Sequence, residues 1–239
     1  MQKTLGSMPA GMPAPPVTIS DMVVDSIVPY KPEYSWNYEV GYKGALIENR
    51  LYAEVAAFYI AVKDIQITDF VDSGQGRLLK NAGRAKSMGF DLALTAVLTD
   101  DLTLSANYGF TRATFRNYKV SDELDYTGNY VPFAPQNTLS VSAVYSKTFR
   151  NRFIDRLHIQ GHYNAAGRIY WTEQNDVYQD FYGLLNLKAG VSKGIVDLNL
   201  WANNVFNTDY TAFYFETNAY KLAQAGRPLT FGADLSVTF

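Results

Sequence analysis

The chain has 239 residues, of which 18% are charged, and 21 basic residues against 23 acidic ones give a net charge of −2. This near-balance lacks the basic footprint of a general nucleic-acid-binding protein, so no nucleic acid is expected as a partner. The absence of cysteine and the presence of only two histidines exclude thiolate sites and argue against a histidine-rich metal site. No apolar run is long enough for a transmembrane helix, although alternating strands can cross a membrane without one.

Residues 1–32 are expected to form an extended or loop segment. The stretch MQKTLGSMPAGMPAPP at 1–16 combines several prolines with no apolar period, and such composition favours extended, irregular structure. Lys3 is not followed by the apolar core that a signal peptide needs. If the protein is exported, we therefore expect its export signal to lie outside this chain.

Residues 33–239 alternate apolar and polar side chains, as β-strands with two different faces do. In 102–111, Leu102, Leu104 and Ala106 fall on one face, whereas Thr103 and Ser105 fall on the other. The same period predicts an all-β chain of nine strands, with little that favours a helix. The expected ranges are 33–46, 50–71, 78–98, 102–118, 135–149, 155–171, 181–193, 195–206 and 228–239.

The connections between these strands alternate in length. Short connections are expected at 47–49, 99–101, 150–154 and 193–194, and long ones at 72–77, 119–134, 172–180 and 207–227. The short connections therefore fall at one end of the sheet and the long ones at the other. This is typical of an antiparallel up-and-down transmembrane β-barrel, with short periplasmic turns and long extracellular loops.

The composition of the two faces favours lipid on one side and water on the other. The apolar face is rich in Leu, Val, Ala, Phe and Tyr, and strands of eleven or more residues suffice to cross a hydrocarbon layer. The opposite face carries charged side chains beside Ser, Thr, Asn and Gly, which a wide, wet lumen tolerates. These charges include Glu39, Lys43, Lys188, Asp197 and Asp234. A soluble sandwich also alternates and remains an alternative.

Aromatic residues gather where the predicted strands meet loops. Because amphipathic rings favour the headgroup level of a membrane, we interpret these groups as an interfacial girdle. The alternative is an aromatic soluble loop or a core corner. The groups are Tyr34 with Trp36, Phe115 with Tyr118, Tyr170 with Trp171, Phe181 with Tyr182, and Phe213 with Tyr214 and Phe215.

For two sets of ionisable residues, a binding role is weighed against a position that simply faces water. Arg77, Lys80, Arg84 and Lys86 form a basic cluster that could face lipopolysaccharide phosphates or an anionic ligand, or be a solvated strand end. His158 and His162 share a strand face but lie about 13 Å apart, too far to chelate one ion between them. They are expected to be polar residues of the lumen.

Six motifs, in order, resemble the C-terminal barrel half of TonB-dependent outer-membrane receptors. They are PEYSWNYEVGYKG at 32–44, RLYAEVAAFYIAVKDIQI at 50–67, NAGRAKSMGFDLAL at 81–94, LTLSANYGFTRATFRNY at 102–118, NNVFNTDY at 203–210 and GRPLTFGADLSVTF at 226–239. Together the resemblance covers about residues 30–239. Some motifs also have a physical reason: Gly89 avoids crowding a neighbouring strand, and Asn203, Asn204 and Asn207 suit a strand end and turn.

The resemblance implies a location and a transport role. Residues 33–239 would be the C-terminal part of a receptor barrel in the outer membrane of a Gram-negative bacterium, surrounded by lipid and lipopolysaccharide. Receptors of this family take up scarce solutes such as iron–siderophore complexes, cobalamin or glycans. The N-terminal plug domain and the segment that meets TonB have no match here, so TonB would act only through a missing N-terminal part. Nine strands are also too few for the 22-stranded wall of such transporters.

The resemblance and the aromatic residues also suggest site residues. The face formed by Phe231, Leu235, Val237 and the terminal Phe239 resembles the signal read by the outer-membrane assembly machinery, and is otherwise a plain closing strand. Aromatic rings stack on flat chelators and sugars. The candidates for ligand contact are Trp171, Tyr178, Tyr214 and Tyr220.

No catalytic constellation accompanies these features. The carboxylates have no spacing that indicates acid–base catalysis, and neither a nucleophile elbow nor a phosphate-binding loop occurs. We therefore expect no enzyme activity, no metal and no cofactor. The alternatives to a transport component are a non-transporting β protein, either a small barrel anchor or a soluble ligand-binding sandwich, and a decayed fragment that exposes sheet edges and aggregates.

Overall fold

The computed structural model describes residues 30–47, 50–70, 77–150, 153–216 and 220–238. Its strands all belong to one compact unit, Lys31–Phe239. The extended segment predicted for 1–32 lies almost entirely outside the described residues. No helix in the described part of the chain is long and apolar enough to span a membrane.

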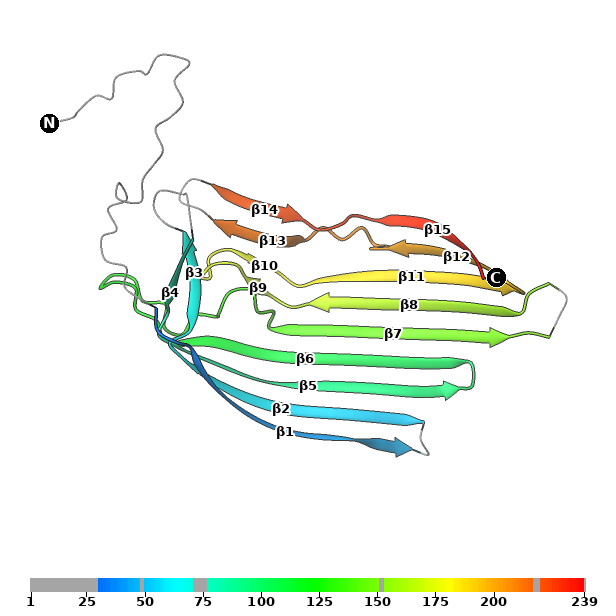
Figure 1. The fold of residues 1–239 in the computed structure, drawn as a ribbon, viewed down its shortest axis with the longest axis horizontal. Coiled ribbons are helices and arrows are strands. Elements are labelled where there is room, and N and C mark those ends of the chain that lie inside the picture. The colour runs from blue at the N-terminus through cyan, green and yellow to red at the C-terminus, as the bar shows by residue number, and fades with distance from the viewer. Residues whose placement is uncertain (1–29, 48–49, 71–76, 151–152, 217–219, 239) are drawn as a thin grey trace, which may run out of the picture. The chain divides into compact units, whose positions relative to one another are not determined.

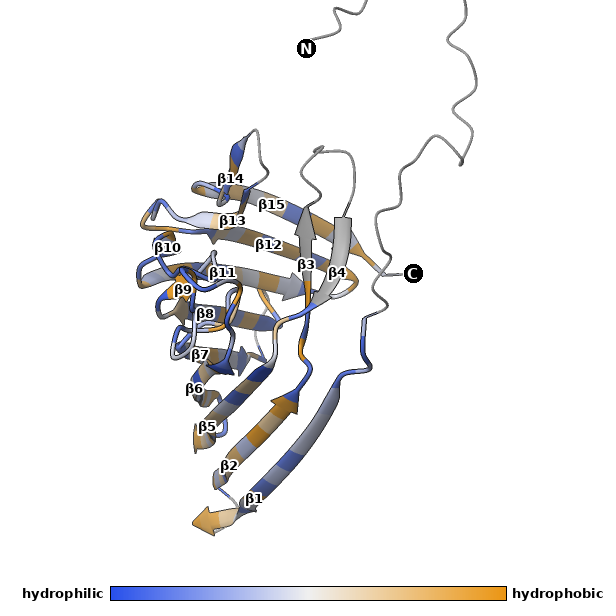
Figure 2. Ribbon diagram, turned by 90° about the vertical axis from the view of Figure 1, so that its left-hand side faces the viewer, coloured by the Kyte–Doolittle hydropathy of each residue, from blue (hydrophilic) through white to orange (hydrophobic). Residues whose placement is uncertain are grey.

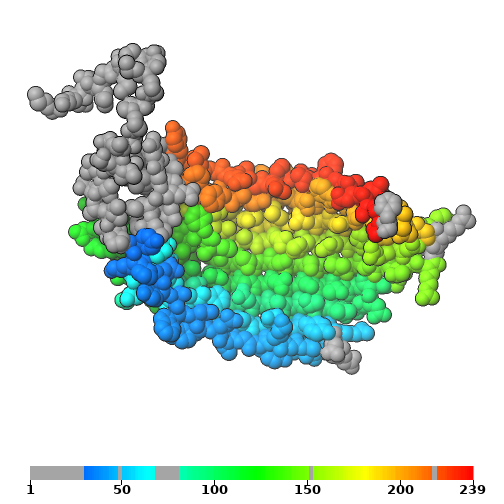
Figure 3. All heavy atoms as spheres, viewed as in Figure 1, coloured from blue at the N-terminus to red at the C-terminus, as the bar shows by residue number. Residues whose placement is uncertain are grey.

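Nine long strands form one antiparallel sheet in which each strand pairs with its neighbour along the chain (Figure 1). In sheet order they are β1 (Tyr34–Ile47), β2 (Leu51–Lys63), β5 (Arg84–Thr99), β6 (Leu102–Asn117), β7 (Asn137–Thr148), β8 (Arg156–Ala166), β11 (Tyr182–Lys193), β12 (Val196–Asn203) and β15 (Thr230–Val237). Figure 3 shows them side by side in chain order, from blue β1 to red β15. The predicted all-β, up-and-down arrangement of nine strands is confirmed.

Short two-stranded hairpins occupy three of the long connections. They are β3 (Gln66–Phe70) with β4 (Arg77–Asn81), β9 (Ile169–Tyr170) with β10 (Tyr178–Gln179), and β13 (Thr211–Glu216) with β14 (Lys221–Ala225). All three lie at the end of the sheet opposite the C-terminus, and we call this the long-loop end (Figure 1). The other end, with the turns after β1, β5, β7 and β11, is the short-turn end.

Two predicted strands are shorter in the structure because the backbone bends within them. The range 50–71 divides at Asp64, whose φ is 55°, and 78–98 divides at Gly83, whose φ is 76°. Both angles are left-handed and interrupt a ladder. The Asn81 side chain fixes the bend at Asp64. It accepts a hydrogen bond from the backbone N–H of Lys31 at 2.7 Å and donates one to the backbone carbonyl of Asp64 at 2.7 Å.

The strand registers separate an apolar face from a largely polar one. One row across the sheet is apolar: Gly44, Ala53, Leu94, Ala106, Val141, Tyr163 and Leu185. The adjacent row on the other face is largely polar: Lys43, Glu54, Ala93, Asn107, Ser140 and Asn164. Figure 2 views the sheet from the long-loop end as an arc. The polar face is concave and the apolar face convex.

The apolar convex face is exposed rather than buried. Val40 is 73% exposed and Leu200 59%, and the described residues form no second sheet against this face. A soluble sandwich would bury such a face between two layers. The small buried clusters instead contain residues of the long-loop end. One consists of Ala82, Ala85, Phe115, Tyr118 and Tyr126, and the other of Ile169, Trp171 and Tyr214.

Candidate functional site

A hollow of about 600 Å³ lies on the concave face and spans six strands from β2 to β11. Alternation along each strand points every second side chain into it. Its polar lining comes from Glu54, Asp91, Asn107, Thr138, Ser140 and Asn164. Carboxylates, amides and hydroxyls provide both acceptors and donors, so this surface can hydrogen-bond a polar partner or hold water.

Charges on the concave face have partners on neighbouring strands. Lys43 Nζ lies 3.3 Å from a carboxylate oxygen of Glu54, and Arg156 lies 3.4 Å from Asp197. Both pairs are substantially exposed, so each contributes little to stability. The prediction that Lys43 and Asp197 lie on the polar face is confirmed by their registers.

The two histidines belong to this polar wall. His162 Nε2 lies 2.9 Å from Ser140 Oγ, and His158 Nε2 lies 2.6 Å from Asn199 Oδ1. Each ring therefore contacts a neutral side chain of another strand. No group of three or more His, Asp or Glu side chains in the described part of the chain is placed to hold a metal ion.

An aromatic cluster borders the hollow at the long-loop end. Trp171 and Tyr214 pack with Ile169, and Ala166 and Tyr182, which also line the hollow, pack against them. The Tyr214 hydroxyl donates to Glu216, which also accepts from Lys221 in the β13–β14 hairpin. These two bonds hold the pKa of Glu216 below its ordinary value.

The structure divides the four candidates for ligand contact into two pairs. Trp171 and Tyr214 are only 8% and 9% exposed, so their rings serve packing within the cluster. Tyr178 and Tyr220 are exposed. The Arg168 guanidinium lies 4.3 Å from the centre of the Tyr178 ring and pairs with Asp180 at 2.6 Å, which fixes that ring from one side.

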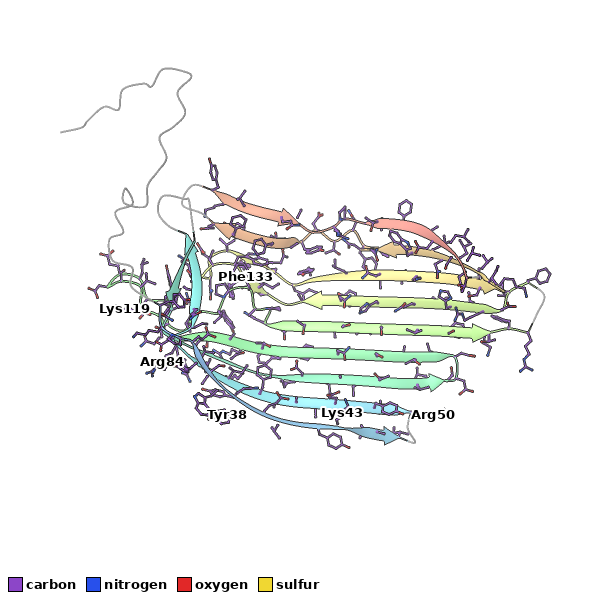
Figure 4. The ribbon with its side chains drawn as sticks, in the orientation of Figure 1. Tyr38, Lys43, Arg50, Arg84, Lys119 and Phe133 are labelled. Atoms are coloured by element: carbon purple, nitrogen blue, oxygen red, sulfur yellow. The ribbon has the colours of Figure 1, made fainter. Side chains whose placement is uncertain are left out.

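Sequence reasoning missed Phe133, which joins the same cluster. Its φ is 63°, an unusual conformation for a bulky residue, and its ring is 52% exposed. The ring stacks on Phe213 with centres 5.7 Å apart and meets Trp171 at 5.6 Å. The only local signal is its place between two prolines in VPFAP at 131–135. Figure 4 labels it among the loop-end elements.

The rings of the predicted aromatic girdle fall into two settings, exposed and buried. Tyr34 and Trp36 are exposed on the convex face near the long-loop end of β1. Phe115 and Tyr118 are buried in a cluster with Ala82 and Ala85. They pack against each other with ring centres 4.8 Å apart. Since a buried ring cannot face lipid, the alternative of a core corner describes these two, as it does Trp171 and Tyr214.

The predicted assembly signal lies along one face of β15. Phe231 and Leu235 are 80% and 70% exposed, and Val237 projects on the same convex face. Phe239 lies outside the described residues. Of the basic cluster, Arg84 and Lys86 lie on β5, whereas the side chains of Arg77 and Lys80 lie outside the described part of the chain.

The comparisons with known proteins agree with this architecture. The sequence model of the family described as TonB dependent receptor-like, beta-barrel matches residues 12–205. The metal-pseudopaline receptor CntO of Pseudomonas aeruginosa is 31% identical over 116 residues, which cover 48% of this chain and 15% of that protein. The probable TonB-dependent siderophore receptor PiuA of Acinetobacter baumannii is 24% identical over 217 residues, covering 87% of this chain and 27% of that protein.

Solved structures show the same fold at low identity. The ferric yersiniabactin uptake receptor FyuA from Yersinia pestis has a TM-score of 0.72 at 24% identity, covering 87% of this chain and 30% of that one. The copper transporter OprC has a TM-score of 0.62 at 15% identity, covering 89% and 32%. The chain thus spans about a third or less of the length of these relatives.

Proposed function

The chain belongs to the TonB-dependent receptor β-barrel family, and on that premise we propose that it forms part of the wall of an outer-membrane uptake receptor. The solute would be scarce and of the iron–siderophore, cobalamin or glycan class. The names of the relatives, which include a metal-pseudopaline receptor and a siderophore receptor, support the metal-chelate class first. The location would be the outer membrane of a Gram-negative bacterium. The relatives are receptors and not enzymes, and we propose no catalytic role.

The observation that carries this proposal is the division of the nine-stranded sheet into an exposed apolar face and a polar concave face. Lipid stabilises the first face and a water-filled lumen accommodates the second. The long-loop end would face the outside of the cell and the short-turn end the periplasm.

The described residues supply wall and loops to the uptake mechanism. The polar hollow would face the lumen, where Glu54, Asp91 and their neighbours can bond a plug domain or a passing polar solute. Tyr178 and Tyr220 would offer rings to the ligand, while Trp171 and Tyr214 pack within the neighbouring buried cluster. TonB would act through an N-terminal plug part of the receptor. We accordingly expect no energy-coupled uptake by residues 1–239 alone.

Single-cysteine labelling tests the membrane arrangement, because the native chain contains no cysteine. Lys188→Cys and Ala189→Cys place a thiol on adjacent residues of β11 that face the concave and convex sides. In outer membranes of cells expressing the exported chain, a water-soluble maleimide is expected to label Lys188→Cys only. Ala189→Cys should react with a lipid-soluble maleimide. A chain that is recovered without detergent, or equal labelling of both thiols by the water-soluble reagent, would contradict the proposal.

Uptake itself is tested in the strain that encodes the chain. Cells with the gene, cells without it and cells without TonB are compared for uptake of a radiolabelled iron–siderophore complex, cobalamin and a labelled oligosaccharide. We expect the gene deletion and the TonB deletion to abolish uptake of the same solute. Normal uptake of all three after deletion of the gene, or uptake that persists without TonB, would overturn the transport role.

A further inference from the structure

A basic patch lies at the long-loop end of the sheet, away from the hollow described above. Its cations are Lys63, Arg84, Lys86 and Arg116, and they surround a depression of about 810 Å³ together with the rings of Tyr34, Trp36 and Tyr59. Figure 4 labels Arg84 at the loop end of β5, with Lys43 and Arg50 toward the opposite end of the sheet.

The register places Lys63, Arg84 and Lys86 on the convex, apolar face, and Arg116 of β6 lines the same depression. Lys86 pairs with Ala61, which pairs with Trp36, and Arg84 pairs with Lys63, which pairs with Tyr34. Continuing along β5 in steps of two from Lys86, the side chains on this face are Met88, Phe90, Leu92 and Leu94. From Met88 to Leu94 this apolar run covers roughly 20 Å of strand at about 3.4 Å per residue. The cations therefore stand at the outer boundary of the apolar band.

The four cations have no anionic partner in the part of the chain that the structure describes. Lys43, Lys119, Arg168 and Lys193 all form ion pairs, whereas no such pair joins Lys63, Arg84, Lys86 or Arg116 to an acid among the described residues. Lys63 and Arg84 also stand directly opposite each other in the register. Like charges in that position destabilise a sheet. A bound anion would remove this repulsion.

The rings beside the cations indicate the depth of the patch in a membrane. Tyr34 and Trp36 are exposed on the same face and at the same level. Tyrosine and tryptophan favour the boundary between hydrocarbon and headgroups. Cations at that boundary meet the phosphates of the lipid headgroups, and arginine can hold a phosphate with two parallel hydrogen bonds.

We propose that the basic patch binds the phosphate groups of the lipid A part of lipopolysaccharide. This inference rests on the proposed outer-membrane location, in which the long-loop end lies in the outer leaflet, where lipopolysaccharide is the lipid. Its acyl chains would lie on the apolar run of β5 below the patch. Arg84 and Arg116 would hold phosphate in bidentate contacts, and Lys63 and Lys86 would add charge.

The experiment measures binding of lipopolysaccharide to the purified full chain in a non-ionic detergent. Four preparations are compared: the unaltered chain, the double variant Arg84→Gln/Lys86→Gln, the variant Arg84→Lys, and Lys188→Gln as a control that removes one charge from the concave face. We expect the double variant to bind about tenfold or more weakly, because two charge-assisted contacts are lost. The affinity of Arg84→Lys for lipopolysaccharide should lie between those of the unaltered chain and the double variant. Lys188→Gln should bind as tightly as the unaltered chain does.

The ligand is varied in parallel to identify the phosphate source. Enzymatically dephosphorylated lipopolysaccharide should bind the unaltered chain as weakly as intact lipopolysaccharide binds the double variant. Inorganic phosphate at matched phosphate concentration should not compete. Equal binding of the intact and dephosphorylated lipids, equal binding by the double variant, or full competition by inorganic phosphate would overturn the proposal. A circular dichroism spectrum that keeps the β-strand signal of the unaltered chain shows that the fold of each variant is intact.

Failure of this inference can be told apart from failure of the proposed function. If the cysteine labelling places the chain in the membrane but the double variant binds lipopolysaccharide normally, only the basic patch is misassigned. If the chain is recovered without detergent, the outer-membrane location and this inference both fail.

Discussion

At the scale of single residues, close approach between strands decides which positions tolerate a side chain. A Cβ at Gly89 would overlap the backbone carbonyl oxygen of Phe110 and lie 2.8 Å from the Phe58 ring. At Gly161, by contrast, an added Cβ would meet only a methyl group of Leu187 at 3.5 Å, an ordinary contact. The sequence motif around Gly89 predicted this crowding, and the structure confirms it.

We expect Gly89→Ala to destabilise the fold by about 1–3 kcal/mol, the usual cost of forcing atoms into a packed position. Gly161→Ala is the matched control and should change stability by less than about 1 kcal/mol, since the new methyl group has room. Urea unfolding in detergent micelles, followed by tryptophan fluorescence, compares the two variants. Similar midpoints for both would contradict the steric argument.

Asp155 ties two turns of the short-turn end together. Its carboxylate accepts the backbone N–H of Gly194 at 2.7 Å and the Lys193 ammonium at 2.7 Å. The first bond and then the second lower the pKa of Asp155 below its ordinary value. A carboxyl group whose pKa is lower in the folded state stabilises the fold above its unfolded pKa of about 3.9. That stabilisation is lost as the pH falls through the folded value.

Replacement of Asp155 by Asn should therefore flatten the pH dependence of stability in the acid range. We expect the unfolding midpoint of the unaltered chain to drop between about pH 5 and pH 2 by more than that of Asp155→Asn. At pH 7 the variant should be slightly less stable. Denaturant titrations at several pH values measure both effects, and identical pH profiles for the two proteins would show that this carboxylate is not coupled to folding.

At the scale of elements, β15 has an apolar convex face and a polar concave face. Phe231 and Leu235 project from the convex face, whereas Asp234 and Ser236 project from the concave face. If the convex face is read by the assembly machinery, the double variant Phe231→Ser/Leu235→Ser should reach the outer membrane several-fold more slowly. Ser236→Ala on the opposite face should not. Pulse-chase fractionation of cells tests this, and equal rates for both variants would leave β15 as a plain closing strand.

The ends of the strands are the features that the sequence pattern predicts least well. Period-two alternation continues through Asp64 and up to Gly83, so it predicts strands longer than those observed. The breaks come from backbone angles at these two residues and from the Asn81 side chain, which bonds to Lys31 and Asp64. Contacts across 17 and 50 positions of the chain are not encoded in local periodicity.

At the scale of the whole molecule, the nine-stranded sheet has two edges, β1 and β15, within the described residues. Strand edges present unpaired backbone groups and favour association with further strands. We expect the chain expressed alone to self-associate in detergent, as measured by light scattering after size-exclusion chromatography. Supplying the remaining strands of a receptor barrel on a second chain should convert it to a discrete complex. A monodisperse monomer that stays stable for days would show that the edges close without further strands.

The sequence by itself determined the all-β class, the nine strands, the two faces and the alternation of short and long connections, since alternation and turn residues act locally along the chain. Only the tertiary structure decided which aromatic residues are buried. Phe115 and Trp171 resembled membrane-facing rings by position but lie in clusters with segments distant in the chain. It also decided that Lys63 and Arg116 join Arg84 and Lys86, because strand register brings together cations that sequence order separates.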